Sequence, residues 1–198
     1  MGYRAGTEYC MSLILRNGTM KARIQQRLDS LEGDLDTLFH ELDHVDQRSL
    51  SIRPDNGGWN VLQIIEHLRM AEFHSYNYIL NKAKVMEQLP KKDLLVKWRE
   101  LNLQLFLNSP FKFKAPAIVN EESFPEELNY DHQKIQWKGS RIEMKEWLIM
   151  QPDHYFHLQA YRHPLAGRMG IDGMLKFFHL HFVRHSKQIK RTLVNAAR

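Results

Sequence analysis

Residues 173–189 read GMLKFFHLHFVRHSKQI, and this stretch decides how the chain is interpreted. Its apolar residues recur at three- and four-residue spacing, which predicts a helix with one buried face. Two histidines, His181 and His185, stand on that face in place of apolar residues. Because burying a polar group without a partner is costly, the pair indicates either hydrogen-bonded core histidines or a metal site.

The rest of the chain predicts an all-α fold, a four-helix bundle. Asn60 and Gln63 have the spacing of a capping box and mark the start of the second helix. No segment shows the alternation of a strand, and Pro152 predicts a kink or a break. We expect main helices over residues 20–45, 60–89, 141–161 and 172–194, and a further helical piece over residues 91–107.

Two segments lack helical periodicity. Periodic sequence begins near Met20, so we expect residues 1–18 to form a flexible tail and residues 19–198 to form one helical domain. Residues 108–140 carry three prolines and irregular polarity. They predict a long loop before the third main helix, of the kind that is usually functional or mobile.

The composition of the 198-residue chain excludes several classes of protein. No apolar run approaches the roughly 18 residues that a membrane span requires, so no membrane association is expected. Cys10 is the single cysteine, which precludes a disulfide within the chain and favours a cytoplasmic location. The net charge of +5 is spread along the chain, so nucleic acid is an unlikely partner.

Residues 40–44 read HELDH and match the H-E-x-x-H signature of zinc proteases. In that interpretation His40 and His44 bind zinc, and a third ligand comes from a second helix, for which Glu66 or Glu72 could be proposed. The pair, however, lies off the apolar stripe of its helix. The pattern therefore favours a solvated polar face near a helix end, where an imidazolium is mildly favourable.

His67 changes the interpretation of the C-terminal pair. It lies between Ile64 and Ala71 on the second helix, at positions that predict a core-facing side chain. In a helical bundle, one histidine of this helix can meet His181 and His185 of the last helix. Three imidazole ligands leave at least one coordination position open, which is typical of catalytic rather than structural metal sites.

Three stretches carry a family resemblance: WNVLQIIEHL at 59–68, FKAPAIV at 113–119 and HPLAGRMGIDGMLKFFHLHFVRHSKQI at 163–189. In order and spacing the chain resembles the DinB/YfiT superfamily over roughly residues 20–195. The resemblance implies a four-helix bundle with a divalent metal held by His67, His181 and His185. Nitrogen ligands suit zinc or nickel. The resemblance also implies a homodimer and, in characterised members, transferases or isomerases that use a low-molecular-weight thiol such as bacillithiol or mycothiol.

We therefore expect a cytoplasmic metal-dependent enzyme of the thiol S-transferase type, acting on a small electrophilic substrate. A metal-dependent hydrolase on the same three-histidine site is an alternative. A non-catalytic, metal-stabilised bundle with a binding or stress-response role is a second alternative. No residue beyond the three histidines is singled out as catalytic.

Overall fold

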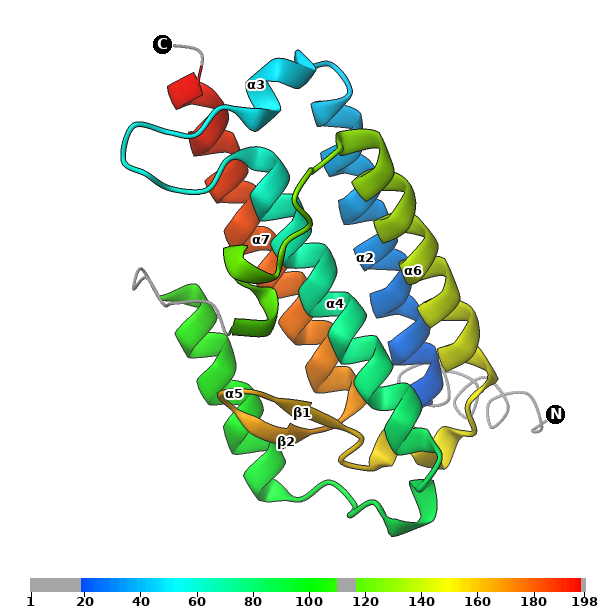
Figure 1. Ribbon diagram of the computed structural model, residues 1–198. Helices are drawn as coiled ribbons and strands as arrows, with labels where there is room; N and C mark the ends of the chain where they lie inside the picture. Colours follow the sequence, from blue (N-terminus) through cyan, green and yellow to red (C-terminus); the bar gives the residue numbers. More distant parts are fainter. Residues whose placement is uncertain (1–18, 110–116, 197–198) are drawn as a thin grey trace, which may run out of the picture.

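Four long helices run alongside one another in the computed structural model, which describes residues 19–109 and 117–196 (Figure 1). They are α2 (Met20–Leu42), α4 (Val61–Ala83), α6 (Tyr130–Met150) and α7 (Ile171–Ala196). Helices α2 and α4 each pack against both α6 and α7. The prediction of an all-α class is thus confirmed, and three of the four main helices begin close to their predicted residues.

Helices α2 and α4 begin where the sequence supplies a capping side chain. Thr19 accepts a hydrogen bond from the backbone of Ala22 at the start of α2. Asn60 and Gln63 form both bonds of the predicted capping box at the start of α4. These side chains satisfy backbone N–H groups that have no partner within the first helical turn.

Helix α6 begins earlier than its sequence suggests. The predicted loop over residues 108–140 is wrong at its C-terminal end, because residues 130–140 are already helical. Asn129 caps this helix, and Tyr130, Gln133 and Trp137 are buried along it. Since Gln133 is polar, the buried stripe did not resemble an apolar helical pattern. The connection between α5 and α6 is therefore shorter than predicted.

Residues 151–170 also differ from the prediction of a helix continuing to residue 161. Helix α6 ends before Pro152, and the chain then forms the 3-10 helix η4 (Asp153–His157). A two-stranded antiparallel sheet follows, with β1 (Tyr161–His163) paired to β2 (Gly167–Met169). Strands of three residues are too short to show an alternating pattern, so the sequence did not reveal them.

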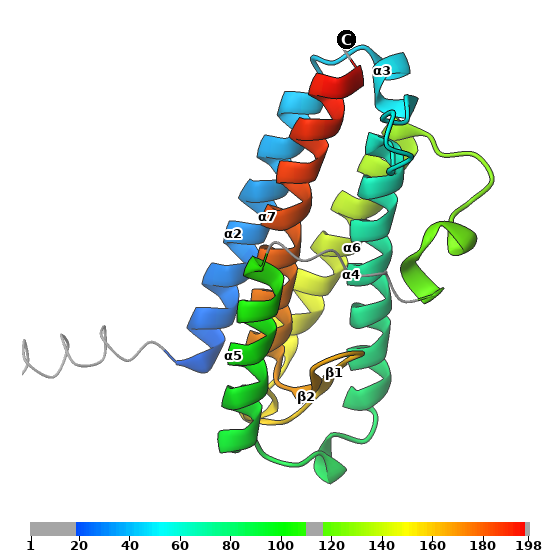
Figure 2. The same cartoon turned by 90° about the vertical axis from the view of Figure 1, so that its left-hand side faces the viewer.

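Shorter elements complete the described chain. The longest of them is α5 (Leu94–Asn108), which packs against α7 and β2 (Figure 2). The others are α3 (Gln47–Ser51), η1 (Met86–Gln88), η2 (Ala117–Val119) and η3 (Glu121–Ser123). In the described ranges, no helix has both the length and the apolarity that a membrane span requires. The predicted tail over residues 1–18 lies outside the described residues.

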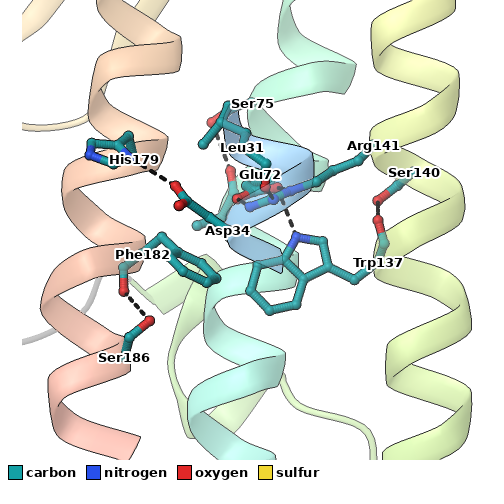
Figure 3. A network of polar contacts seen from close by, with 11 residues as sticks. Leu31, Asp34, Glu72, Ser75, Trp137, Ser140, Arg141, His179, Phe182 and Ser186 are labelled. Carbon is teal, nitrogen blue, oxygen red and sulfur yellow. Dashed lines mark hydrogen bonds and ion pairs between the residues drawn. The ribbon is translucent and has the colours of Figure 1, made fainter. Parts of the chain in front are cut away.

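A buried ionic network joins three of the long helices (Figure 3). Arg141 of α6 donates to both carboxylate oxygens of Glu72 on α4, over 2.8 and 2.7 Å, and also to the carbonyl of Leu31 on α2. The indole N–H of Trp137 donates to the same carboxylate over 2.8 Å. The network thus fixes the position of α4, the helix that carries His67, against α2 and α6.

Candidate metal centre

His67 lies on the buried face of α4, as predicted. Its side chain is buried within the bundle, and the neighbouring positions Ile64 and Ala71 are buried as well. The capping box at Asn60 sets the start of the helix and therefore the direction in which this face points. The side chain of His67 points toward α7, the long helix that packs against α4.

His181 and His185 project from consecutive turns of α7 toward His67. The His67 and His181 rings are 4.9 Å apart between centroids, as are the His67 and His185 rings. The rings of His181 and His185 are 4.6 Å apart. One ligand atom from each of the three residues lies within 4.8 Å of the others, close enough to hold a metal ion.

Hydrogen bonds to Nδ1 set the tautomer of two of these imidazoles. His67 Nδ1 lies 2.7 Å from the carbonyl oxygen of Val119, which can only accept, so Nδ1 carries the proton. His185 Nδ1 lies 2.8 Å from Oε1 of Gln188 and donates to it. In both rings Nε2 is therefore left with a free lone pair. Histidine ligands of metals are commonly held by a carbonyl or amide in this way.

The nitrogen geometry fits a divalent metal. Nε2 of His67 and Nε2 of His181 face each other across 3.0 Å. Two nitrogens bound about 2.0–2.1 Å from a tetrahedral zinc lie roughly 3.3 Å apart, so the two rings need to separate by only a few tenths of an ångström. The donor set, three nitrogen atoms, suits zinc, nickel or copper better than magnesium or calcium.

The environment keeps the imidazoles neutral, which is the form that binds metals. Burial lowers the pKa of His67. Burial, reinforced by the neighbouring His185 and His67, holds the pKa of His181 well below its usual value. Burial and the proximity of His67 lower the pKa of His185 to about 3. All three rings thus offer lone pairs at neutral pH.

Aromatic side chains surround the three histidines. Phe177, one turn before His181, stacks on its ring with 5.1 Å between centroids and an interplanar angle of 18°. Trp59 lies 5.1 Å from the His67 ring, and Phe124 packs against Trp59 at 5.6 Å. These rings limit the access of water to the imidazoles and strengthen electrostatic interactions there.

Two small cavities lie between pairs of helices in the described part of the chain. A cavity of about 30 Å³ lies between α2 and α6, and one of about 10 Å³ lies between α5 and α7. Phe177, the ring stacked on His181, lines the smaller one.

The HELDH segment lies apart from this cluster. His40, Glu41 and His44 are exposed at the end of α2, and the two imidazole rings pack edge to face at 5.0 Å. Both proposed third ligands are engaged elsewhere: Glu66 pairs with Arg69 and Glu72 with Arg141. Among the described residues, the group of acidic, histidine or cysteine side chains that could hold a metal is the three-histidine cluster.

Sequence reasoning identified the three histidines but missed the residues that orient them. Gln188 lies three residues after His185 on the same helix face, a spacing that could have signalled a side-chain contact. The sequence does not indicate the contact made by Val119, because every residue has a backbone carbonyl. Phe177 belongs to the apolar pattern of residues 173–189, but its stacking on His181 depends on rotamers that the sequence does not show.

Comparison with known proteins gives no match, whether to a protein-family model, to a curated protein or to a solved structure. Membership of the DinB/YfiT superfamily therefore stays a prediction. Function is therefore inferred from the geometry and chemistry of the three-histidine cluster.

Proposed function

We propose that this protein is a divalent-metal-dependent enzyme of the DinB/YfiT type, with a low-molecular-weight thiol S-transferase as the leading activity. Zinc or nickel bound by His67, His181 and His185 would lower the pKa of a thiol or a water at the open coordination position. The observation that carries the proposal is the convergence of three neutral imidazoles, two with Nδ1 held by an oxygen acceptor.

The chain's own residues support this chemistry by positioning and by excluding water. Val119 and Gln188 fix the ring planes of His67 and His185, so that little reorganisation is needed when a ligand binds. Trp59 and Phe177 offer flat apolar surfaces against which a small electrophile can lie. In the transfer, the thiol sulfur forms a bond to carbon, the leaving group departs with its electron pair, and the thiol proton passes to solvent.

Metal binding is tested first, with the purified full chain. Zinc and nickel contents are measured after dialysis, and thermal unfolding is followed with and without each metal. We expect one equivalent per chain and a higher unfolding temperature with metal, because a ligand that binds only the folded state stabilises it. His67→Ala and His181→Ala should abolish both effects.

His40→Ala and His44→Ala are the matched controls, since they remove an exposed histidine pair of the same i,i+4 spacing. Both variants should bind metal like the wild type. Loss of metal in His40→Ala with retention in His67→Ala would transfer the site to the HELDH segment. A wild-type chain that binds neither metal would eliminate the enzyme proposal.

Activity is then tested with metal-loaded protein and a panel of thiols, using an aryl halide as the electrophile. Formation of the aryl thioether, release of halide and its loss in His185→Ala would support the transferase. Histidine-dependent hydrolysis of an aryl ester, without thioether formation, would instead indicate the hydrolase. Metal-dependent stabilisation with neither reaction across the panels would favour a non-catalytic binding or stress-response bundle.

A further inference from the structure

The imidazole of His67 joins the three-histidine cluster to a segment at the protein surface. Its Nε2 faces Nε2 of His181, and its Nδ1 donates to the carbonyl oxygen of Val119 over 2.7 Å. Val119 belongs to residues 117–124, which comprise η2 and η3 and which we call the strap. The strap stands on the outer side of α4 (Figure 2). A ligand at Nε2 of His67 is therefore separated from the strap by a single aromatic ring.

A small apolar cluster holds the strap on α4. The cluster consists of Met70 and Ala71 of α4 together with Val119 and the partly buried Phe124 of the strap. It is separate from the two larger hydrophobic cores of the bundle. Segments with few buried apolar contacts open at a lower free-energy cost than the whole fold. We therefore expect the strap to open locally while the four long helices stay folded.

Two polar contacts of the strap do little to fix its position on the bundle. Glu121 pairs with Arg53, but both side chains are 46% exposed, and exposed ion pairs contribute little to stability. Asn120 caps η3 by accepting a hydrogen bond from the backbone of Glu122, which is a contact within the strap itself. By contrast, the hydrogen bond from His67 to Val119 is buried and joins the strap directly to α4.

The two nitrogens of the His67 ring are electronically coupled. A cation at Nε2 withdraws electron density from the ring, and this makes the Nδ1–H group a stronger donor to the carbonyl of Val119. A carbonyl that accepts from Nδ1 makes Nε2 a stronger metal ligand in return. By thermodynamic linkage, the factor by which a metal ion favours the closed strap equals the factor by which strap closure raises the metal affinity.

We propose that the strap is a metal-coupled cover of the three-histidine site, which closes on α4 when a divalent metal binds and opens more readily without it. This inference rests on the proposed metal-dependent function, and it assigns the regulation of that site to the strap. Closure keeps Phe124 packed on Trp59 with 5.6 Å between ring centroids, and Trp59 in turn lies 5.1 Å from the ring of His67. Opening wets these rings, so loss of the metal and exposure of the site to water occur together.

Hydrogen exchange of the full chain tests this coupling, measured by mass spectrometry with and without zinc (or nickel, where the chain retains nickel instead). The backbone amides of the strap should exchange at least ~10-fold more slowly with zinc. Residues 84–89, a connection that follows α4, should exchange equally in both states. His181→Ala removes one ligand and leaves the partners of the His67–Val119 hydrogen bond in place, so it should abolish the effect of zinc.

Phe124→Ala loosens the strap without altering a histidine. We expect faster exchange of the strap in the metal-free variant and a zinc dissociation constant that is several-fold higher. The increase should not exceed the factor by which zinc slows strap exchange in the wild type, because linkage sets that limit. Val119→Ala repeats the test, since it shortens the buried side chain and keeps the carbonyl. Ile142→Ala, which truncates a 48% exposed residue of α6, is the matched control and should change neither quantity.

The outcomes separate the strap from the metal site, once urea unfolding has shown that each variant is folded. Zinc binding that leaves the exchange of the strap unchanged would overturn the coupling and leave the metal site intact. A Phe124→Ala chain with faster strap exchange and wild-type affinity for zinc would do the same. A wild-type chain that binds neither zinc nor nickel would remove the proposed function, and the coupling with it.

Discussion

Arg141→Met is expected to destabilise the fold strongly, because it leaves a buried carboxylate without its cation. The side chains of Arg141 and Glu72 are 6% and 5% exposed, and two hydrogen bonds of 2.8 and 2.7 Å join them. Methionine fills much of the volume of arginine, so the loss is chiefly electrostatic. In the variant, the Glu72 carboxylate keeps the N–H of Trp137 as a donor and loses a bidentate partner.

The expected loss in the free energy of unfolding follows from the burial of the Arg141–Glu72 ion pair. Removing one partner of a buried ion pair typically costs about 3–5 kcal/mol, since the remaining charge stays desolvated. Replacing both partners of a buried ion pair with well-packed apolar residues of similar volume, by contrast, often leaves the stability of the fold unchanged. The double variant Glu72→Leu/Arg141→Met should therefore recover at least about half of the loss in the free energy of unfolding.

Urea unfolding followed by circular dichroism measures these differences. Lys138→Met is the control, since the ion pair between Lys138 and Asp36 is 43% and 53% exposed, and such pairs contribute about 0–1 kcal/mol. An Arg141→Met variant that loses no more stability than Lys138→Met would contradict this expectation. A double variant less stable than the Arg141→Met single variant would contradict it as well.

Three further predictions concern the orientation of a ligand, pH and capping. Gln188→Ala releases Nδ1 of His185 and should weaken zinc binding by about 10–100-fold in a competition titration, while the exposed neighbour Lys187→Ala should leave it unchanged. Burial lowers the pKa of His163 to about 4 in the folded state, so the unfolded chain binds the proton more readily and stability is lost as pH falls from about 6.5 toward 4. His163→Asn removes this titration, so its free energy of unfolding should fall by about 2 kcal/mol less than that of the wild type between pH 7 and pH 4.5; equal losses would contradict the assignment. Asn60→Ala removes the N-cap of α4 and should cost about 1 kcal/mol in urea unfolding, and a cost within error of zero would show that the cap is dispensable.

The three- and four-residue spacing of apolar residues predicted the helices correctly where the buried face of the helix is apolar. Helix α2 buries a regular run of leucines, and α7 buries Met174, Phe178 and Phe182, so both were predictable in extent. The same reasoning failed for the start of α6, where Gln133 and Arg141 occupy buried positions. Their burial depends on Glu66 and Glu72, which lie far away in the sequence. Polar core residues that bond across helices leave no local sequence pattern.

The candidate ligands were predictable from the amino-acid sequence. His181 and His185 interrupt an apolar stripe and His67 occupies a core-facing position, and these placements follow from helical geometry alone. The packing of α4 against α7, which brings Nε2 of His67 to 3.0 Å from Nε2 of His181, was not predictable from the sequence. The contact by which Val119 fixes the ring of His67 was not predictable either. The physical reason is that periodicity records which way a side chain points, whereas distances between helices depend on how all the side chains between them pack.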